Sequence, residues 1–304
     1  GYTDAARGGG RRAGEARDGG RTRITNSCAP GADAGADKGI FVRLENSLEE
    51  ELSFAADELK KRRKLVGIYC EYTPRELILA AGAWPVCLCG YDAEMIPPAE
   101  QDLPSTLCPL VKSSYGYIRE KACPLFEKAA AIVAETTCDG KKKMYELIRD
   151  RHPTFILELT QKSDSEAAFQ HWFGEVRALQ AFLEKTLAVT VTPDKLKEAI
   201  RRMNERRRTL RSFYEFTKSD PAYLTGCERL LLNQRIACTP LEKELLEAVR
   251  SELERRRAAN QAVAPEKTPR ILVTGVPIGP DVDKAIRLIE ECGAVVREVV
   301  AEDE

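Results

Sequence analysis

Short apolar runs separated by amphipathic stretches divide much of the chain into alternating strands and helices. Four such runs between residues 65 and 159 are typical of strands that are buried on both faces. They are Leu65–Tyr69, Trp84–Leu88, Ala130–Ala134 and Thr154–Leu159. Helical patterns separate them at about 73–81, 109–122 and 140–150. This alternation predicts an α/β fold with a parallel sheet that is covered on both sides.

A different pattern begins at residue 164. Long amphipathic stretches cover Glu166–Leu187, Pro193–Phe216 and Pro240–Arg257, and no strand candidate of similar quality lies among them. Arginines between positions 201 and 211 give the second stretch a basic patch, which we interpret as a solvated helix face. After a linker with two prolines, the pattern of strand, loop, helix and strand returns from Arg270 to Val299.

The first 39 residues consist mainly of Gly, Ala, Arg and Asp and contain almost no large apolar residue. Such a segment cannot bury enough surface to offset the entropy of ordering, so we expect a disordered leader. Ser47 is expected to cap a helix that runs to about Lys64. We therefore divide the chain into a leader at 1–39, a first α/β lobe at 40–163, a helical segment at 164–260 and the beginning of a second α/β lobe at 261–304.

The second lobe is expected to be incomplete. A strand–helix–strand unit of about 35 residues is too small to enclose a core of its own. Either it joins the first sheet or the natural domain continues beyond Glu304, and we favour the second alternative.

Composition narrows the classes of function. Lys and Arg total 47 and Asp and Glu total 48, so the net charge of −1 gives no reason to expect nucleic acid or a membrane surface as a partner. No apolar run approaches the ~20 residues of a membrane span, and no secretory signal is recognisable. The expected compartment is the cytoplasm, where the ten cysteines are free thiols or metal ligands rather than disulfides. Because the chain has two histidines, any metal would be held mainly by sulfur, which favours zinc or iron–sulfur chemistry.

Conventional nucleotide binding and hydrolysis are both disfavoured. The segment Gly275–Pro280 follows a predicted strand but carries neither common phosphate-binding motif, and its two prolines lack N–H donors. Ser113 and Ser114 lack the G-x-S-x-G pattern of a hydrolase nucleophile.

Three cysteines differ from the other seven in their positions. Cys108, Cys123 and Cys138 follow one another at intervals of fifteen residues, and each lies at the boundary of a predicted element. Because the carboxyl ends of parallel strands gather their loops at one crevice, the three thiols could converge there. Helix N-termini and Lys141–Lys143 would favour their thiolate forms. No C-x-x-C pair is present, so spacing alone leaves both a metal cluster and unligated thiols open.

Most of the other cysteines are interpreted as small buried hydrophobes. They are Cys70, Cys87, Cys89, Cys227, Cys238 and Cys292. Cys87 and Cys89 fit this interpretation least well, since they point to the same face of one predicted strand. No role is assigned to Cys28 in the leader.

Three stretches of the sequence resemble the 2-hydroxyacyl-CoA dehydratase family. They are Gly67–Gly82, Leu107–Gly116 and Glu135–Met144, of which the last is long and specific. Within this family, the additional cysteine in Lys121–Leu125 points to the double-cubane-cluster proteins. The resemblance extends from about Leu65 to the C-terminus.

The resemblance implies two Rossmann-like lobes, a helical segment between them, and an oxygen-sensitive iron–sulfur cluster in the cleft. Cluster ligation is carried over onto Cys108, Cys123 and Cys138 only, and no catalytic residue is assigned. The cluster would be a double-cubane [8Fe-9S] cluster or a [4Fe-4S] cluster, and an ATP-hydrolysing iron–sulfur activator protein would supply its electrons. A homodimer is expected. Since the second lobe of the family continues further and supplies more cysteine ligands, the chain resembles a fragment.

Three functions remain as hypotheses. The double-cubane branch implies an ATP-dependent, low-potential reductase of small molecules, which Cys123 favours. The alternative is an (R)-2-hydroxyacyl-CoA dehydratase subunit, in which one electron makes a ketyl radical from the substrate thioester and water leaves. The hypothesis of another class is a non-catalytic thiol-binding or metal-binding α/β module, with the helical segment as an interaction arm.

Overall fold

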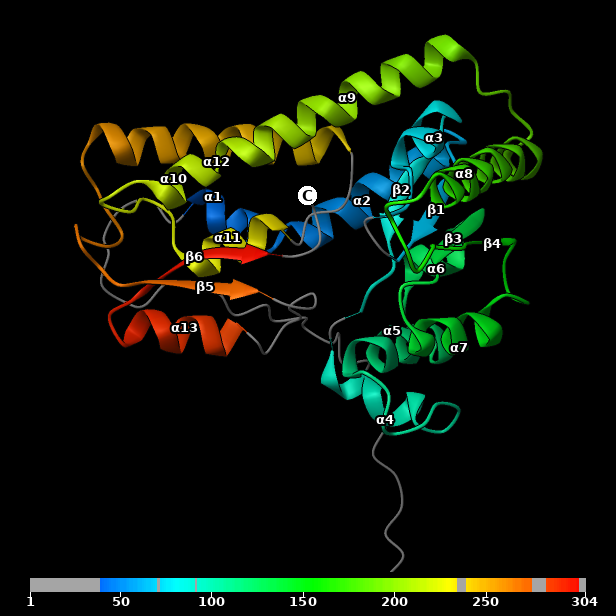
Figure 1. Cartoon of the computed structure of the whole chain (residues 1–304), viewed down its shortest axis with the longest axis horizontal. Helices are drawn as coiled ribbons and strands as arrows, with labels where there is room; N and C mark the ends of the chain where they lie inside the picture. Colours follow the sequence, from blue (N-terminus) through cyan, green and yellow to red (C-terminus); the bar gives the residue numbers. More distant parts are fainter. Residues whose placement is uncertain (1–38, 70–71, 91, 234–238, 275–282, 301–304) are drawn as a thin grey trace, which may run out of the picture.

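The structure is a computed structural model that describes residues 39–69, 72–90, 92–233, 239–274 and 283–300 (Figure 1). Its main sheet has four parallel strands in the order β2-β1-β3-β4. These are β1 (Leu65–Ile68), β2 (Trp84–Cys87), β3 (Ala131–Glu135) and β4 (Thr154–Leu157). The four predicted strands of this region are present, and the predicted α/β class with a parallel sheet is confirmed.

Apolar packing on both faces stabilises the two central strands, β1 and β3. Val66, Ile68 and Val133 pack on one face against α3, α8 and α9, while Leu65 and Ile132 pack on the other against α5 and α7. The covering helices are α3 (Arg75–Ala80), α5 (Pro109–Arg119), α7 (Asp139–Ile148), α8 (Glu166–Leu187) and α9 (Pro193–Ser212). The edge strand β4 is partly exposed, so complete burial holds for the central strands and not for β4.

The middle of the chain is helical, as predicted. α8, α9 and α12 (Pro240–Ala258) begin at the predicted residues, and Figure 1 shows α9 and α12 running alongside one another. Ser165, Thr192 and Thr239 cap these helices, each accepting the backbone N–H three residues further on. These caps satisfy N–H groups that would otherwise lack a partner, which explains why the helices begin there. In the part of the chain that the structure describes, no helix is long and apolar enough to cross a membrane.

The basic patch of α9 is only partly solvated, contrary to prediction. Arg206 is 12% exposed at its side chain and lies 2.9 Å from Glu242 of α12, which is 4% exposed. Arg207 lies 2.7 Å from Glu76 of α3. Since a buried charge is stable only when it is paired, Arg206 ties α9 to α12 rather than facing water.

The helix predicted from Ser47 to Lys64 is shorter and begins differently. α1 (Gly39–Glu45) precedes α2 (Ser47–Lys60), and the N-cap of α2 is Asn46. Ser47 is buried, and its hydroxyl donates to the backbone carbonyl of Leu44 at 3.0 Å instead of capping. α1 forms because Phe41 and Leu44 pack against the apolar face of α12. Residues 1–38 of the predicted leader lie outside the described residues.

Shorter helices complete the described part of the first 260 residues. They are η1 (Ala93–Met95), α4 (Ile96–Ala99), α6 (Pro124–Lys128), α10 (Tyr214–Lys218) and α11 (Gly226–Asn233).

A second, smaller parallel sheet contains β5 (Arg270–Thr274) and β6 (Val295–Val300), with α13 (Asp283–Glu291) between them in sequence. Within the described residues this unit does not join the first sheet. It packs on α11, where Leu230 meets Ile286 and Val296. The segment Gly275–Pro280, for which no nucleotide binding was expected, lies outside the described residues.

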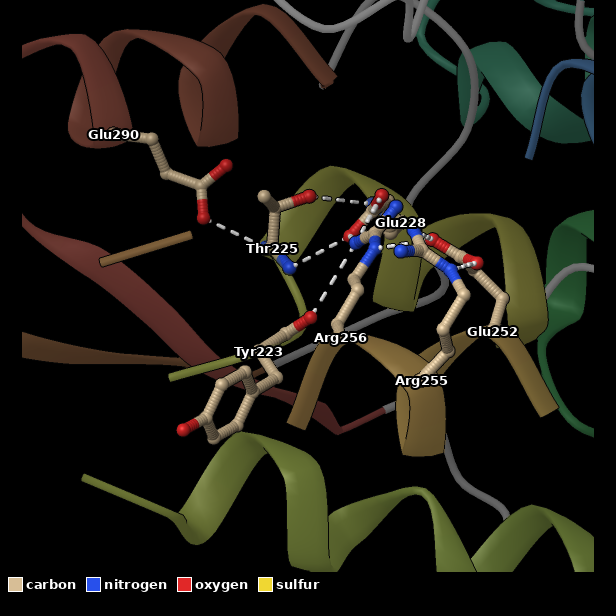
Figure 2. A network of polar contacts seen from close by, with 8 residues as sticks. Tyr223, Thr225, Glu228, Glu252, Arg255, Arg256 and Glu290 are labelled. Atoms are coloured by element: carbon tan, nitrogen blue, oxygen red, sulfur yellow. Dashed lines mark hydrogen bonds and ion pairs between the residues drawn. The ribbon is translucent and has the colours of Figure 1, made fainter. Parts of the chain in front are cut away.

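Polar contacts fasten α11 to its neighbours on two sides (Figure 2). The Glu290 carboxylate of α13 accepts the backbone N–H of Gly226 at 2.7 Å. Glu228 forms an ion pair with Arg256 of α12 at 2.9 Å, and Arg256 also bonds Glu252. Burial raises the pKa of Glu228, although the charge of Arg256 opposes the shift. α11 therefore links the second sheet to the helical segment.

Gly226 is expected to be essential to this contact. A methyl group at position 226 would lie 2.5 Å from Cβ of Val296 and 2.9 Å from Cγ2 of Ile286, so one of the packed elements would have to move. We expect Gly226→Ala to lower the free energy of unfolding by about 1–3 kcal/mol in urea titrations.

Gly174→Ala is the matched control, because a methyl group at this position in α8 meets nothing within 4 Å. Alanine there should leave stability unchanged or raise it by up to about 1 kcal/mol. Equal stability of Gly226→Ala and the wild type would show that α11 does not press against the second sheet as described.

Candidate metal centre

The three predicted ligand cysteines all stand at helix N-caps. Cys108 precedes α5, Cys123 precedes α6 and Cys138 precedes α7. Pro109 and Pro124 occupy the first turns of α5 and α6, as expected for a residue that has no N–H to satisfy. The sulfur atoms therefore lie next to the electropositive ends of three helices.

Two of these sulfurs are bonded by the backbone of the helix that follows. Sγ of Cys123 accepts the N–H of Phe126, and Sγ of Cys138 accepts the N–H of Lys141, each at 3.4 Å. Cys108 makes no such capping bond. An N–H group directed at sulfur stabilises negative charge on it, whether as a free thiolate or as a metal ligand.

Cys108 and Cys138 lie at the same end of the first sheet. Cys138 follows β3, and both cysteines are exposed. The first turns of α5 and α7 adjoin, since a methyl group on Gly140 would lie 3.3 Å from the Leu107 side chain and 3.9 Å from Sγ of Cys138. The two thiols are thus accessible at the carboxyl end of the sheet, where the sequence predicted a crevice.

Cys123 has a different environment. It is half-buried against the core that α5 and α7 share with the sheet. Burial raises the pKa of its thiol, and the N–H bond from Phe126 only partly offsets this effect. The expectation that a helix N-terminus favours the thiolate was therefore wrong for Cys123, because loss of solvation outweighs the helix end.

No group of three or more Cys, His, Asp or Glu side chains among the described residues is placed to hold one metal ion. A single zinc ion with Zn–S bonds of about 2.3 Å would need its thiolates within roughly 4.6 Å of one another. A polynuclear cluster separates its thiolates more widely, because each thiolate binds a different iron atom. Ligation of such a cluster by Cys108, Cys123 and Cys138 stays a prediction.

The structure describes four of the remaining seven cysteines. Cys87, Cys89 and Cys227 are partly buried, while Cys292 is exposed just after α13, so its interpretation as a buried hydrophobe was wrong. Cys28, Cys70 and Cys238 lie outside the described residues.

Glu135 was not singled out in the sequence, although it is the most unusual carboxyl group near the cysteines. It ends β3 and is fully buried, and the Thr73 hydroxyl donates to its Oε1. Among the described residues, neither its Oε2 nor the hydroxyl of Thr137 has a hydrogen-bond partner. Burial raises the pKa of Glu135 to about 7, against the opposing effects of Thr73 and the Lys141 charge. A single carboxyl group at the end of an apolar strand, three residues before Cys138, was the signal that could have revealed it.

Comparison with known proteins finds one matching family model and several related subunits. A family model described as "2-hydroxyglutaryl-CoA dehydratase, D-component" matches residues 70–302. The putative dehydratase subunit YjiM of Escherichia coli (strain K12) is 38% identical over 244 residues, which are 79% of this chain and 63% of that protein.

More distant relatives include subunits of both dehydratases and a reductase. Lactoyl-CoA dehydratase subunit beta of Anaerotignum propionicum is 24% identical over 71% of this chain and 56% of that protein. A subunit of benzoyl-CoA reductase from Thauera aromatica is 23% identical over 67% of this chain and 54% of that protein. The chain spans less than two thirds of the length of these relatives.

Glu135 gives the folded chain a measurable pH dependence. Its pKa of about 7 lies above the ordinary carboxyl value of 4.5, so between these values the folded chain keeps a proton that the unfolded chain releases. Its contribution to stability is therefore lost as the pH rises from about 4.5 to 7, by at most on the order of 3 kcal/mol. Glu135→Gln is always neutral and can still accept the Thr73 hydrogen bond.

The expected result is that Glu135→Gln gains stability over the wild type as the pH is raised through this window. Urea unfolding at pH 5 and pH 8 measures the difference. Glu146→Gln, which changes an exposed carboxylate of α7 paired with Lys143, is the control and should show little pH-dependent difference. A constant difference between Glu135→Gln and the wild type at both pH values would mean that Glu135 is ionised in the folded chain.

Proposed function

The chain belongs to the 2-hydroxyglutaryl-CoA dehydratase D-component family, and within it we propose that the chain forms part of an iron–sulfur enzyme. The proposed activity is that of a double-cubane-type, ATP-dependent reductase that transfers low-potential electrons to small molecules. Its ligands from this lobe would be Cys108, Cys123 and Cys138. The observation that carries the proposal is the placement of all three thiols at helix N-caps, two of them at the carboxyl end of one parallel sheet.

The residues of this chain would have two tasks at the centre. The N-termini of α5, α6 and α7 direct partial positive charge at sulfur and would offset the negative charge of a thiolate-bound cluster. Cys123, whose pKa is raised by burial, would give up its proton only when iron binds. When bound, the cluster would supply one-electron chemistry at low potential, which no protein side chain provides.

A second candidate function is a subunit of a 2-hydroxyacyl-CoA dehydratase with a [4Fe-4S] cluster. It is favoured by the names of the relatives, which are described as a putative dehydratase subunit and as lactoyl-CoA dehydratase subunit beta. The partly buried position of Cys123 agrees with it, since Cys108 and Cys138 are the two exposed thiols of the three. Here the substrate would be an acyl-CoA thioester that loses water without net oxidation or reduction.

Both functions would require partners. We propose an ATP-hydrolysing iron–sulfur activator as electron donor and a homodimer as the assembled form of the double-cubane type. A non-catalytic module that binds metal or thiols is the remaining alternative, and it predicts that no electron transfer accompanies metal binding.

Cys123→Ser separates the two enzymatic proposals. Serine preserves the size of the side chain but lacks the soft sulfur that iron prefers. In a version of the chain with the full length of its relatives, we expect the substitution to lower iron content by about half or more and to abolish small-molecule reduction. The measurements are iron per protomer and the absorption spectrum near ~400 nm, on protein prepared without oxygen.

Cys227→Ser is the matched control, because Cys227 is also half-buried but lies in α11, which packs on the second sheet. It should leave iron content unchanged. Equal iron and equal spectra for Cys123→Ser and the wild type would remove Cys123 from the ligand set and move the preference to the dehydratase. Absence of iron from every variant and from the wild type would favour the non-catalytic module.

A further inference from the structure

Two cysteines outside the predicted ligand set lie in contact at the end of β2. The backbone N–H of Cys89 donates to Sγ of Cys87 at 3.4 Å, and the thiol of Cys89 donates to the backbone carbonyl of Tyr69 at 3.1 Å. The pKa of Cys87 is lowered chiefly by the adjacent Cys89 side chain; the backbone N–H of Cys89 and the charge of Arg75 act in the same direction, and burial opposes them. One sulfur is therefore prepared to act as a thiolate while the other is held beside it.

The positions of these residues make reaction between the two sulfurs feasible. Cys87 is the last residue of β2, and Cys89 follows two residues later, close enough for its backbone N–H to reach Sγ of Cys87. Two residues span about 6.6 Å where the chain is fully extended and less where it bends, which is within the Cα separation that a disulfide tolerates. A bond formed there would be strained and easily reduced, so it would serve as a reversible couple rather than as a structural link.

The two cysteines differ from the residue between them in exposure to solvent. Both cysteines are partly exposed, whereas the intervening Leu88 is buried in the core. A small thiol-reactive molecule would approach the pair from this partly exposed side, while the packed Leu88 keeps the backbone between the two cysteines in place.

We propose that Cys87 and Cys89 form a redox-active dithiol that exchanges with low-molecular-weight disulfides. The Cys87 thiolate attacks one sulfur of the disulfide RS–SR, which breaks the S–S bond, forms a Cys87–S–SR mixed disulfide and releases one RS⁻. The Cys89 thiolate then attacks Sγ of Cys87, which forms the Cys87–Cys89 disulfide and releases the second RS⁻. The two cysteine protons end on the two thiols, so a dithiol and RSSR become a protein disulfide and two RSH. This activity is independent of the iron–sulfur function proposed above.

The test is differential thiol labelling of the full chain in glutathione buffers that range from reducing to oxidising. Free thiols are blocked with one alkylating label, the protein is reduced, and newly freed thiols receive an isotopically distinct label. Mass spectrometry of peptide fragments then reads the two labels at each cysteine. In the wild type we expect Cys87 and Cys89 to lose the first label together, in equal proportion and at the same buffer ratio.

A second variant keeps the test informative. In Cys89→Ala the resolving sulfur is absent, so Cys87 should accumulate as a mixed disulfide with glutathione, whereas Cys227→Ala should behave as the wild type. Three results would overturn the proposal: retention of the first label at both positions in the most oxidising buffer, unequal oxidation of the two residues, or pairing of Cys87 with Cys123.

Discussion

The parallel register between β1 and β3 is the constraint on which the rest of the first lobe depends. Val66 pairs with Ala131 and Ile68 with Val133, and both strands are buried by helices on both faces. Because parallel strands end at the same edge, the chain must leave β1, β2 and β3 on one side of the sheet. The residues with distinctive chemistry follow those ends: Thr73 after β1, Cys89 after β2 and Cys138 after β3. No pattern of metal-binding residues is needed to bring them near one another.

At this edge of the sheet, burial and nearby positive charge have opposite effects on the pKa values of acidic side chains. Cys123 stands at a helix N-terminus, yet burial raises the pKa of its thiol. Glu135 lies close to the charges of Lys141 and Arg75, yet burial raises its pKa to about 7. The loss of hydration is the largest effect at both groups, because a partial helix charge or a neighbouring cation replaces only part of what water supplies. Cys138 accepts a comparable bond from the backbone but differs from both groups in being exposed.

Local signals in the sequence account for much of the fold. The long helices α8, α9 and α12 begin where predicted because a Ser or Thr cap, followed in α9 and α12 by a first-turn proline, is a property of a few adjacent residues. α1 was missed because its stability comes from Phe41 and Leu44 packing on α12, about 200 positions away in the chain. The burial of Arg206, Cys123 and Glu135 was missed for the same reason, since burial is decided by what the fold places around a residue. The candidate ligands could be found from spacing and prolines, but the effect of burial on the pKa of Cys123 could not.

The position of the second sheet relative to the first is specified by a series of contacts through the helices. Arg207 of α9 pairs with Glu76 of α3, and Arg206 of the same helix pairs with Glu242 of α12. At the far end of α12, Arg256 pairs with Glu228 of α11, which in turn packs on β6 and α13.

Apolar contacts supply most of the free energy of this assembly, because exposed ion pairs such as Arg207–Glu76 contribute little. The buried pairs Arg206–Glu242 and Arg256–Glu228 constrain the arrangement more strongly, because separating either pair would leave an unpaired charge out of water. Orientations of the two sheets that separate Arg206 from Glu242, or Arg256 from Glu228, are therefore disfavoured. The helical segment thus holds the cysteine-bearing edge and the second sheet in one arrangement, which is what a centre assembled from both parts of a chain would need.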